Sequence, residues 1–147
     1  MSINTCSGAI SLSRELETAS AKFYQEMAQR FERDRELFLG LAKENAKFTT
    51  QIERAYYGVI TDAIEGCFAF NLNPEEFRVP AELPKGIGQV EAVGEAIKME
   101  EQMLRFYQTA AEQSKHLMAD VPRSFTLVAK KRSERVPKFK ALLAAKP

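Results

Sequence analysis

The chain is poor in the residues that mark secreted, metal-binding and membrane-spanning proteins. It contains no tryptophan, one histidine and two cysteines among 147 residues. Cys6 and Cys67 lack the spacing of a metal-binding motif, and a domain of this length needs no disulfide to hold its core. No apolar run is long enough to cross a bilayer, and the first residues lack the basic and apolar parts of a signal peptide. We therefore expect a cytoplasmic protein that does not associate with a membrane.

An excess of charge of one sign is also missing. Lysine and arginine number 21 against 20 aspartates and glutamates, so the formal net charge is +1. Near-neutral charge gives no general attraction for nucleic acid or another polyanion. One C-terminal segment is locally basic but has neither a recognised binding motif nor aromatic residues suited to stacking on bases, and such charges usually form a solvated face. Its basic residues are Lys130, Lys131, Arg132, Arg135, Lys138 and Lys140. Nucleic acid is therefore not the favoured partner.

The chain does contain an internal repeat. Segment 17–25, ETASAKFYQ, recurs as segment 100–108, EEQMLRFYQ. A second segment follows each copy, FLGLAKEN at 38–45 and FTLVAKKR at 125–132. Repetition at this scale indicates that each half is one supersecondary unit, here a pair of helices.

Apolar residues return every three to four positions through both halves, which predicts helices rather than strands. We expect helices over about 10–31, 34–64 and 89–117, and a last helix that is capped by Asp120 or Ser124, reaches about residue 142 and is bent or shortened by Pro137. Glycines and prolines interrupt the pattern between them, and Asn73-Pro74 has the form of a capped short helix. The prediction is an all-α, ferritin-like four-helix bundle in a single domain, 1–147, made of helical hairpins at 10–65 and 89–143 joined by one long crossover connection at 66–88.

Two acidic residues interrupt the apolar stripes. Glu17 and Glu100 occupy equivalent positions in the two copies, each on the face expected to be buried. An isolated carboxylate is too costly to bury without a partner. In di-iron carboxylate bundles the partner is a pair of metal ions, bound by one glutamate from each of two helices and by a Glu-x-x-His pair from each of the others.

The residues around these glutamates resemble the rubrerythrin family of ferritin-like proteins, over nearly the whole chain. The similarity lies in Leu16-Glu17 with Phe23-Tyr24, and in Ala96-Ile97 and Glu100 with Phe106-Tyr107 and Ala110-Ala111. It implies that Glu17 and Glu100 match iron ligands of the family. It also implies an Ala-x-x-Glu-x-x-His motif on the second and fourth helices. When the motif is aligned on Ala42 and Ala129, its Glu and His positions hold Asn45 and Phe48 on the second helix and Arg132 and Arg135 on the fourth.

All four of these ligands are therefore substituted, and the rubredoxin-type cysteine motif of some family members is absent. A shifted register does not restore them, because Glu44 and Glu134 lie about 100° or more around the helix from the inward stripe. The single histidine, His116, lies far along the third helix from Glu100 and is expected at the surface. No metal is favoured; if iron binds, Glu17 and Glu100 are its ligands.

The substitutions suggest what took the place of the metal. An arginine fork can bond a carboxylate at two points, so we hypothesise a buried cluster of Glu17, Glu100 and Arg132, with Asn45 completing the hydrogen bonds. The alternative is that Arg132 and Arg135 turn outward and cover the core with their stems. Two tyrosines follow the glutamates by two helical turns and are expected to line the same interior, Tyr24 and Tyr107.

Three functional classes follow. The favoured one is a rubrerythrin-like protein without its di-iron centre, in a structural, interaction or regulatory role, as a homodimer or with a protein partner. The second is a non-haem iron oxidoreductase of the peroxidase or oxidase type that uses Glu17 and Glu100 at an atypical site. The third is a carrier of a small ligand between the helices.

Overall fold

Long helices form most of the chain in the computed structural model, which describes residues 2–59, 69–117 and 119–145. They are α1 (Cys6–Arg30), α2 (Arg35–Val59), α4 (Gln89–Gln113), α5 (Asp120–Ser133) and α6 (Arg135–Ala145). Over the described ranges the β-type pairing is confined to an isolated antiparallel bridge between Ile3 and Leu72. The expected all-α class and the helical bundle are confirmed.

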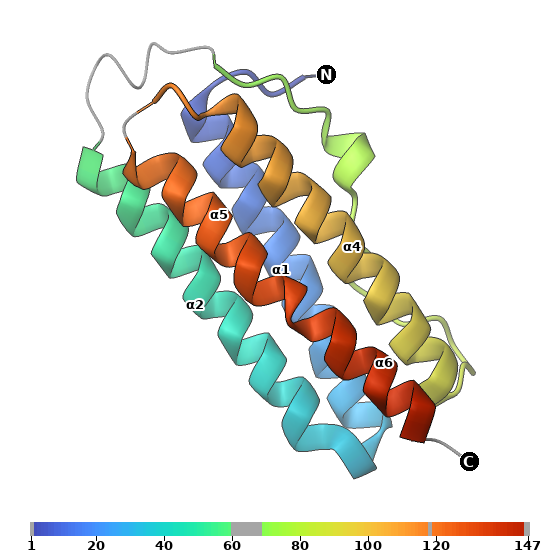
Figure 1. The fold of residues 1–147 in the computed structure, drawn as a ribbon. Helices are drawn as coiled ribbons and strands as arrows, with labels where there is room; N and C mark the ends of the chain where they lie inside the picture. Colours follow the sequence, from blue (N-terminus) through green and yellow to red (C-terminus); the bar gives the residue numbers. More distant parts are fainter. Residues whose placement is uncertain (1, 60–68, 118, 146–147) are drawn as a thin grey trace.

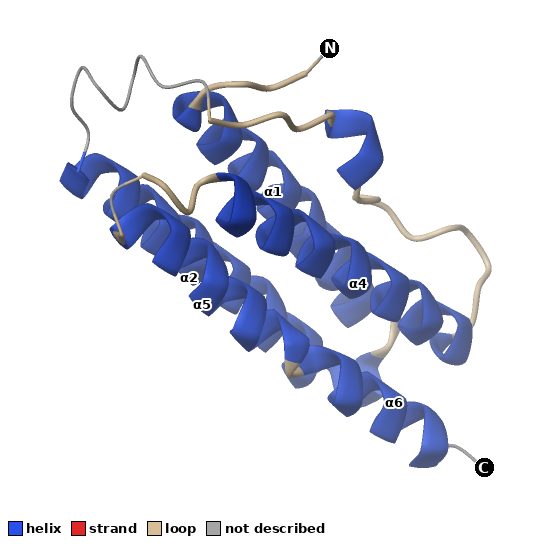
Figure 2. Ribbon diagram, turned by 45° about the horizontal axis from the view of Figure 1, so that its top comes forward, coloured by secondary structure: helices blue, strands red, loops and turns tan. Residues whose placement is uncertain are grey.

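The helices lie side by side as two antiparallel hairpins (Figure 1). The first hairpin is α1 and α2, joined by the short 3-10 helix η1 (Glu32–Asp34), and the second is α4 followed by α5 and α6. α2 packs beside α5, and α1 lies beside α4. α2 and α4 run in the same direction, so the segment that leads into α4 travels along the length of the bundle (Figures 1 and 2).

Two helix ends differ from the sequence prediction because side chains cap them locally. α1 begins at Cys6 rather than Ile10, since the Thr5 hydroxyl oxygen accepts a hydrogen bond from the backbone N–H of Gly8 at 3.0 Å. α4 ends at Gln113 rather than residue 117, since Ser114 leaves the helical conformation and its hydroxyl donates to the Ala110 carbonyl at 2.7 Å. Apolar periodicity does not report such caps.

The fourth helix of the bundle is broken, as its proline predicts. α5 ends at Ser133 and α6 begins at Arg135. Pro137 has no N–H to donate to the Ser133 carbonyl, and its ring would collide with that carbonyl in a continuous helix. The helix therefore restarts with the proline in the first turn of α6, where the missing donor is tolerated.

The connection before α4 is held to the bundle by both its backbone and its apolar side chains. Asn73 caps the short 3-10 helix η2 (Pro74–Phe77), as predicted, by accepting from the Glu75 N–H at 3.1 Å. The Gln113 side chain both donates to and accepts from the backbone of Asn71. Five apolar side chains of the segment are buried: Phe70, Leu72, Phe77, Val79 and Leu83. The predicted end of the second helix at residue 65 and start of the connection at 66 lie outside the described residues.

The apolar core runs along the inside of the four-helix arrangement. Near its middle it contains polar and charged side chains that are almost completely buried: Glu17, Ser20, Asn45, Glu100, Arg132 and Arg135. None of the helices in the described segments combines the length and apolar character that spanning a membrane requires. The buried polar residues therefore identify the part of the fold that needs a chemical explanation.

The Thr5 cap predicts a measurable loss of stability. Thr5→Ala should lower the free energy of unfolding by about 1 kcal/mol, because it leaves the first-turn N–H groups of α1 without their side-chain acceptor. Denaturant unfolding followed by circular dichroism measures the change. The matched control is Thr50→Ala, an exposed threonine within α2 that bonds only its own helix, where alanine is the better helix former. Equal losses in both variants would contradict the role of the cap.

Candidate functional site

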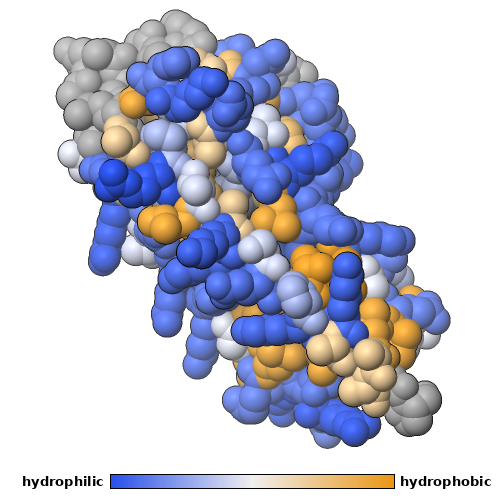
Figure 3. Space-filling view, viewed as in Figure 1, coloured by the Kyte–Doolittle hydropathy of each residue, from blue (hydrophilic) through white to orange (hydrophobic). Residues whose placement is uncertain are grey.

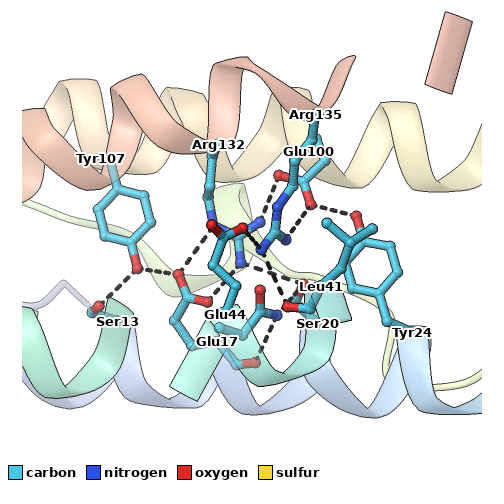
Figure 4. Close-up of polar contacts among 11 residues, drawn as sticks. Ser13, Glu17, Ser20, Tyr24, Leu41, Glu44, Glu100, Tyr107, Arg132 and Arg135 are labelled. Atoms are coloured by element: carbon cyan, nitrogen blue, oxygen red, sulfur yellow. Dashed lines mark hydrogen bonds and ion pairs between the residues drawn. The ribbon is translucent and has the colours of Figure 1, made fainter. Parts of the chain in front are cut away.

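The buried polar residues form one connected cluster at the middle of the bundle (Figure 4). α1 contributes Glu17, α4 contributes Glu100, and two arginines come from the two sides of the break in the fourth helix, Arg132 from α5 and Arg135 from α6. At most 2% of each of these side chains is exposed. The helix break leaves both arginines pointing inward, so they do not turn out to cover the core.

Arg132 lies between the two glutamates and bonds both of them. Its Nε and Nη2 donate to the two oxygens of Glu17 at 3.1 and 2.6 Å, which is a fork-to-fork pair. Its Nη1 donates to Oε1 of Glu100 at 2.5 Å. One guanidinium therefore joins α1, α4 and α5 through three hydrogen bonds to carboxylate.

Arg135 supplies the second positive charge. Its Nη1 donates to Oε2 of Glu100 at 3.1 Å, and its Nη2 donates to the Leu41 carbonyl of α2 at 3.2 Å. Nη2 also bonds the carboxylate of Glu44 at 2.8 Å, which is 41% exposed at the edge of the cluster. The two fully buried carboxylates are thus matched by two buried guanidiniums.

The tyrosines connect the two copies of the repeat crosswise. The Tyr107 hydroxyl of α4 donates to Oε2 of Glu17 at 2.5 Å, and the Tyr24 hydroxyl of α1 donates to Oε2 of Glu100. Each tyrosine therefore bonds the glutamate of the other copy. A buried Ser13 adds a hydroxyl contact to Tyr107 at 3.0 Å, which the sequence pattern did not single out.

Asn45 joins the hydrogen bonds of the cluster through Ser20, whose hydroxyl also accepts from Arg132 at 3.4 Å, and does not bond a carboxylate directly. Its Nδ2 donates to the Ser20 hydroxyl at 2.9 Å and to the backbone carbonyl of Glu17 at 3.4 Å. Oε2 of each glutamate accepts from both a tyrosine and an arginine. The Oδ1 of Asn45 is buried without a hydrogen-bond partner, and a groove of about 420 Å³ between α1 and α2 is lined by both Asn45 and Glu17.

Phe48 lies nearly one turn beyond Asn45 on α2 and faces both cations. The guanidinium carbons of Arg132 and Arg135 lie 5.4 and 5.2 Å from its ring centre. Arg135 also lies 5.5 Å from the ring centre of Tyr24. These aromatic faces stabilise the buried cations at distances typical of cation–π contacts.

Burial and charge act in opposite directions on the ionisation of the cluster. Burial raises the pKa of Glu100, but the charges of Arg132 and Arg135 with the Tyr24 hydrogen bond outweigh it, so the pKa is lowered. Burial lowers the pKa of Arg132, and the two glutamates reverse this and raise it well above its ordinary value. Burial, followed by the adjacent carboxylate, raises the pKa of both Tyr24 and Tyr107. The groups are held as carboxylate, guanidinium and neutral phenol.

The residues present do not fit a di-iron centre. Each of the four oxygens of Glu17 and Glu100 already accepts a hydrogen bond from an arginine or tyrosine. Fixed guanidiniums repel an incoming cation. Where residues are described, no three or more His, Cys, Asp or Glu side chains form a group that could hold a metal ion. His116 is exposed beyond the end of α4, as expected for a surface histidine.

Comparison with protein-family models, with curated proteins and with solved structures gives no match to this chain. The interpretation of the site therefore depends on its own geometry and on the residues that form it.

The position of Arg132 predicts a large effect of its removal. Arg132→Ala should lower the free energy of unfolding by about 3–5 kcal/mol, because it leaves the Glu17 carboxylate buried without a cation. Thermal and denaturant unfolding measure the loss, and Lys131→Ala, exposed on the next position of α5, is the matched control.

A double-mutant cycle separates lost charge from lost packing. Glu17→Gln combined with Arg132→Met should cost less than the sum of the single substitutions, because removing both charges leaves neither stranded. Additive losses, or an Arg132→Ala shift no larger than that of Lys131→Ala, would contradict the electrostatic role of the cluster.

The lowered pKa of Glu100 predicts weakening in acid. The unfolded chain binds a proton at Glu100 at higher pH than the folded chain does, so this contribution to stability is complete above the ordinary pKa of 4.5 and is lost as pH falls through the lower folded value. Denaturant unfolding across this acidic range should show the decline, and Glu100→Gln should flatten it relative to the exposed control Glu101→Gln. An unchanged slope in Glu100→Gln would disprove the linkage.

Proposed function

We propose that this protein is a ferritin-like, rubrerythrin-related bundle in which an internal ion-pair cluster takes the place of the di-iron centre, and that it serves a non-catalytic structural, interaction or regulatory role. One observation carries the proposal. The Arg132 guanidinium lies between the two glutamates that correspond to family iron ligands and bonds both.

The arrangement of the helices supports the ferritin-like part of the proposal. Two helical hairpins, a long connection and parallel α2 and α4 are the features expected of that topology (Figure 1). The four positions that the resemblance assigns to metal ligands on the second and fourth helices all lie at or beside the cluster: Asn45, Phe48, Arg132 and Arg135. The proposal therefore explains why two glutamates lie in the core and why both are paired with arginines.

The iron oxidoreductase is a weaker proposal because nothing at the cluster offers an open coordination position. Its acidic oxygens are occupied, and its nearest additional carboxylate, Glu44, is bonded to Arg135. The small-ligand carrier has one observation in its favour. The groove between α1 and α2 reaches Asn45, whose buried Oδ1 lacks a hydrogen-bond donor.

Metal analysis of protein purified from iron-supplemented cells tests the favoured function. The wild type should contain no stoichiometric iron and show no visible absorption band. The matched variant restores the family pattern through Asn45→Glu, Phe48→His, Arg132→Glu and Arg135→His, and should take up about two iron ions per chain if the backbone retains a ferritin-like geometry.

The outcomes separate the two parts of the proposal. About two iron ions in the folded wild type would overturn the metal-free function and favour the oxidoreductase. A restored variant that folds, by circular dichroism, but binds no iron would remove the support for the ferritin-like geometry.

A further inference from the structure

A second groove lies away from the cluster, between α4 and α5. Its volume is about 600 Å³, and its apolar lining includes Leu104, Ala111 and Ala129. The lining runs from Pro122 to Ser133 on α5, which corresponds to about 16 Å along that helix. On α4 it runs from Leu104 to Glu112, about 12 Å, and Lys115 extends it just beyond the end of the helix. Figure 3, drawn from the side on which Figure 1 shows α4 and α5, has hydrophobic and weakly polar side chains set between charged ones.

Positive charge dominates the sides of this groove. Three of its lining residues are cationic, Lys115, Arg123 and Lys130, and one is anionic, Glu112. Glu112 is bonded to Lys115 at 2.6 Å, and Arg123 is 3.7 Å from Asp120, while no ion pair of Lys130 occurs among the described side chains. The side chains of Lys115 and Arg123 are 55% and 67% exposed. The groove therefore combines an apolar base with accessible cations.

The backbone around the groove restricts the conformation of an occupant. α4 and α5 satisfy their own backbone hydrogen bonds in the helical part of the lining, so the groove presents side chains and not an open strand edge. An extended peptide would find no backbone groups to pair with there. A helix bonds its own backbone, and a length of about 16 Å matches about three turns.

From the apolar base, the cationic sides and the length, we infer that the groove between α4 and α5 binds an acidic amphipathic helix of a partner protein. The apolar face of that helix packs on Leu104, Ala111 and Ala129, and its carboxylates pair with Arg123, Lys130 and Lys115. The inference names a surface for the interaction role proposed above and rests on that role. It does not depend on the metal content of the cluster.

A labelled peptide provides the test. The probe is a stapled helix with leucine and alanine on one face and glutamate on the other, and the matched probe carries lysine in place of glutamate. Fluorescence anisotropy with the full chain should show binding of the glutamate peptide and none of the lysine peptide. Arg123→Glu with Lys130→Glu should weaken binding at least about tenfold.

The controls separate this groove from general charge. Lys47→Glu with Arg54→Glu makes the same change in net charge at another groove, on the exposed face of α2, and should leave binding unchanged. Thr126→Trp, an exposed position within the α4–α5 groove, should block the peptide by filling its site. The circular dichroism spectrum of each variant establishes that it folds.

Three results would overturn the inference. They are failure of the glutamate peptide to bind the wild type, equal weakening by both pairs of charge reversals, and binding that Thr126→Trp does not affect. Salt-sensitive retention of a DNA duplex that the Arg123 and Lys130 reversals abolish, without peptide binding, would assign the surface to nucleic acid instead. Failure of the peptide to bind would not change the iron measurements, and iron in the wild type would not change the peptide measurement. The failure of one proposal can therefore be distinguished from the failure of the other.

Discussion

Two carboxylates lie almost completely shielded from water in the core, and the way in which they are neutralised constrains how the four helices pack. Glu17 and Glu100 project from different hairpins into the same interior. Each would cost several kcal/mol if it were left unpaired. Arg132 and Arg135 remove this cost by entering from the fourth helix, which can then close against α1, α2 and α4 with apolar residues on either side of the cluster. This electrostatic requirement favours the arrangement in which the two guanidiniums together reach both carboxylates.

The cluster is only partly symmetric. The repeat places a glutamate and a tyrosine at the same spacing in both copies, and the structure pairs each tyrosine with the other copy's glutamate. The second and fourth helices have diverged, because α2 supplies an amide and an aromatic ring where α5 and α6 supply two guanidiniums. The ring of Phe48 makes cation–π contacts with both arginines. The aromatic ring of α2 and the two guanidiniums of α5 and α6 therefore contact one another across the interior.

Much of the fold can be read from the sequence because apolar periodicity and helix breakers are local signals. Pro137 identifies the break in the fourth helix, and Asn73 identifies the cap of η2. The ends of α1 and α4 were missed because a threonine or serine caps a helix only if its own rotamer and backbone allow it. Within the site, the periodicity of the inward-facing residues predicts that Glu17, Glu100 and Arg132 lie at the same height along the bundle. They do not reveal that Asn45 turns to Ser20, nor that a tyrosine crosses to the neighbouring helix, because such pairings depend on the distances between helix axes.

The origin of the cations also governs which hairpins can associate. Among the described side chains, the first hairpin brings an acid to the interior and no buried cation, while the second brings an acid together with both guanidiniums. Two first hairpins packed together would confine two negative charges, and two second hairpins would confine an excess of positive charge. Buried positive and negative charges are equal in number only when a first hairpin packs on a second hairpin. The broken fourth helix thus limits how copies of this chain can exchange hairpins during folding. An exchanged dimer has a neutral interior only if each first hairpin packs on a second hairpin, as in the native chain.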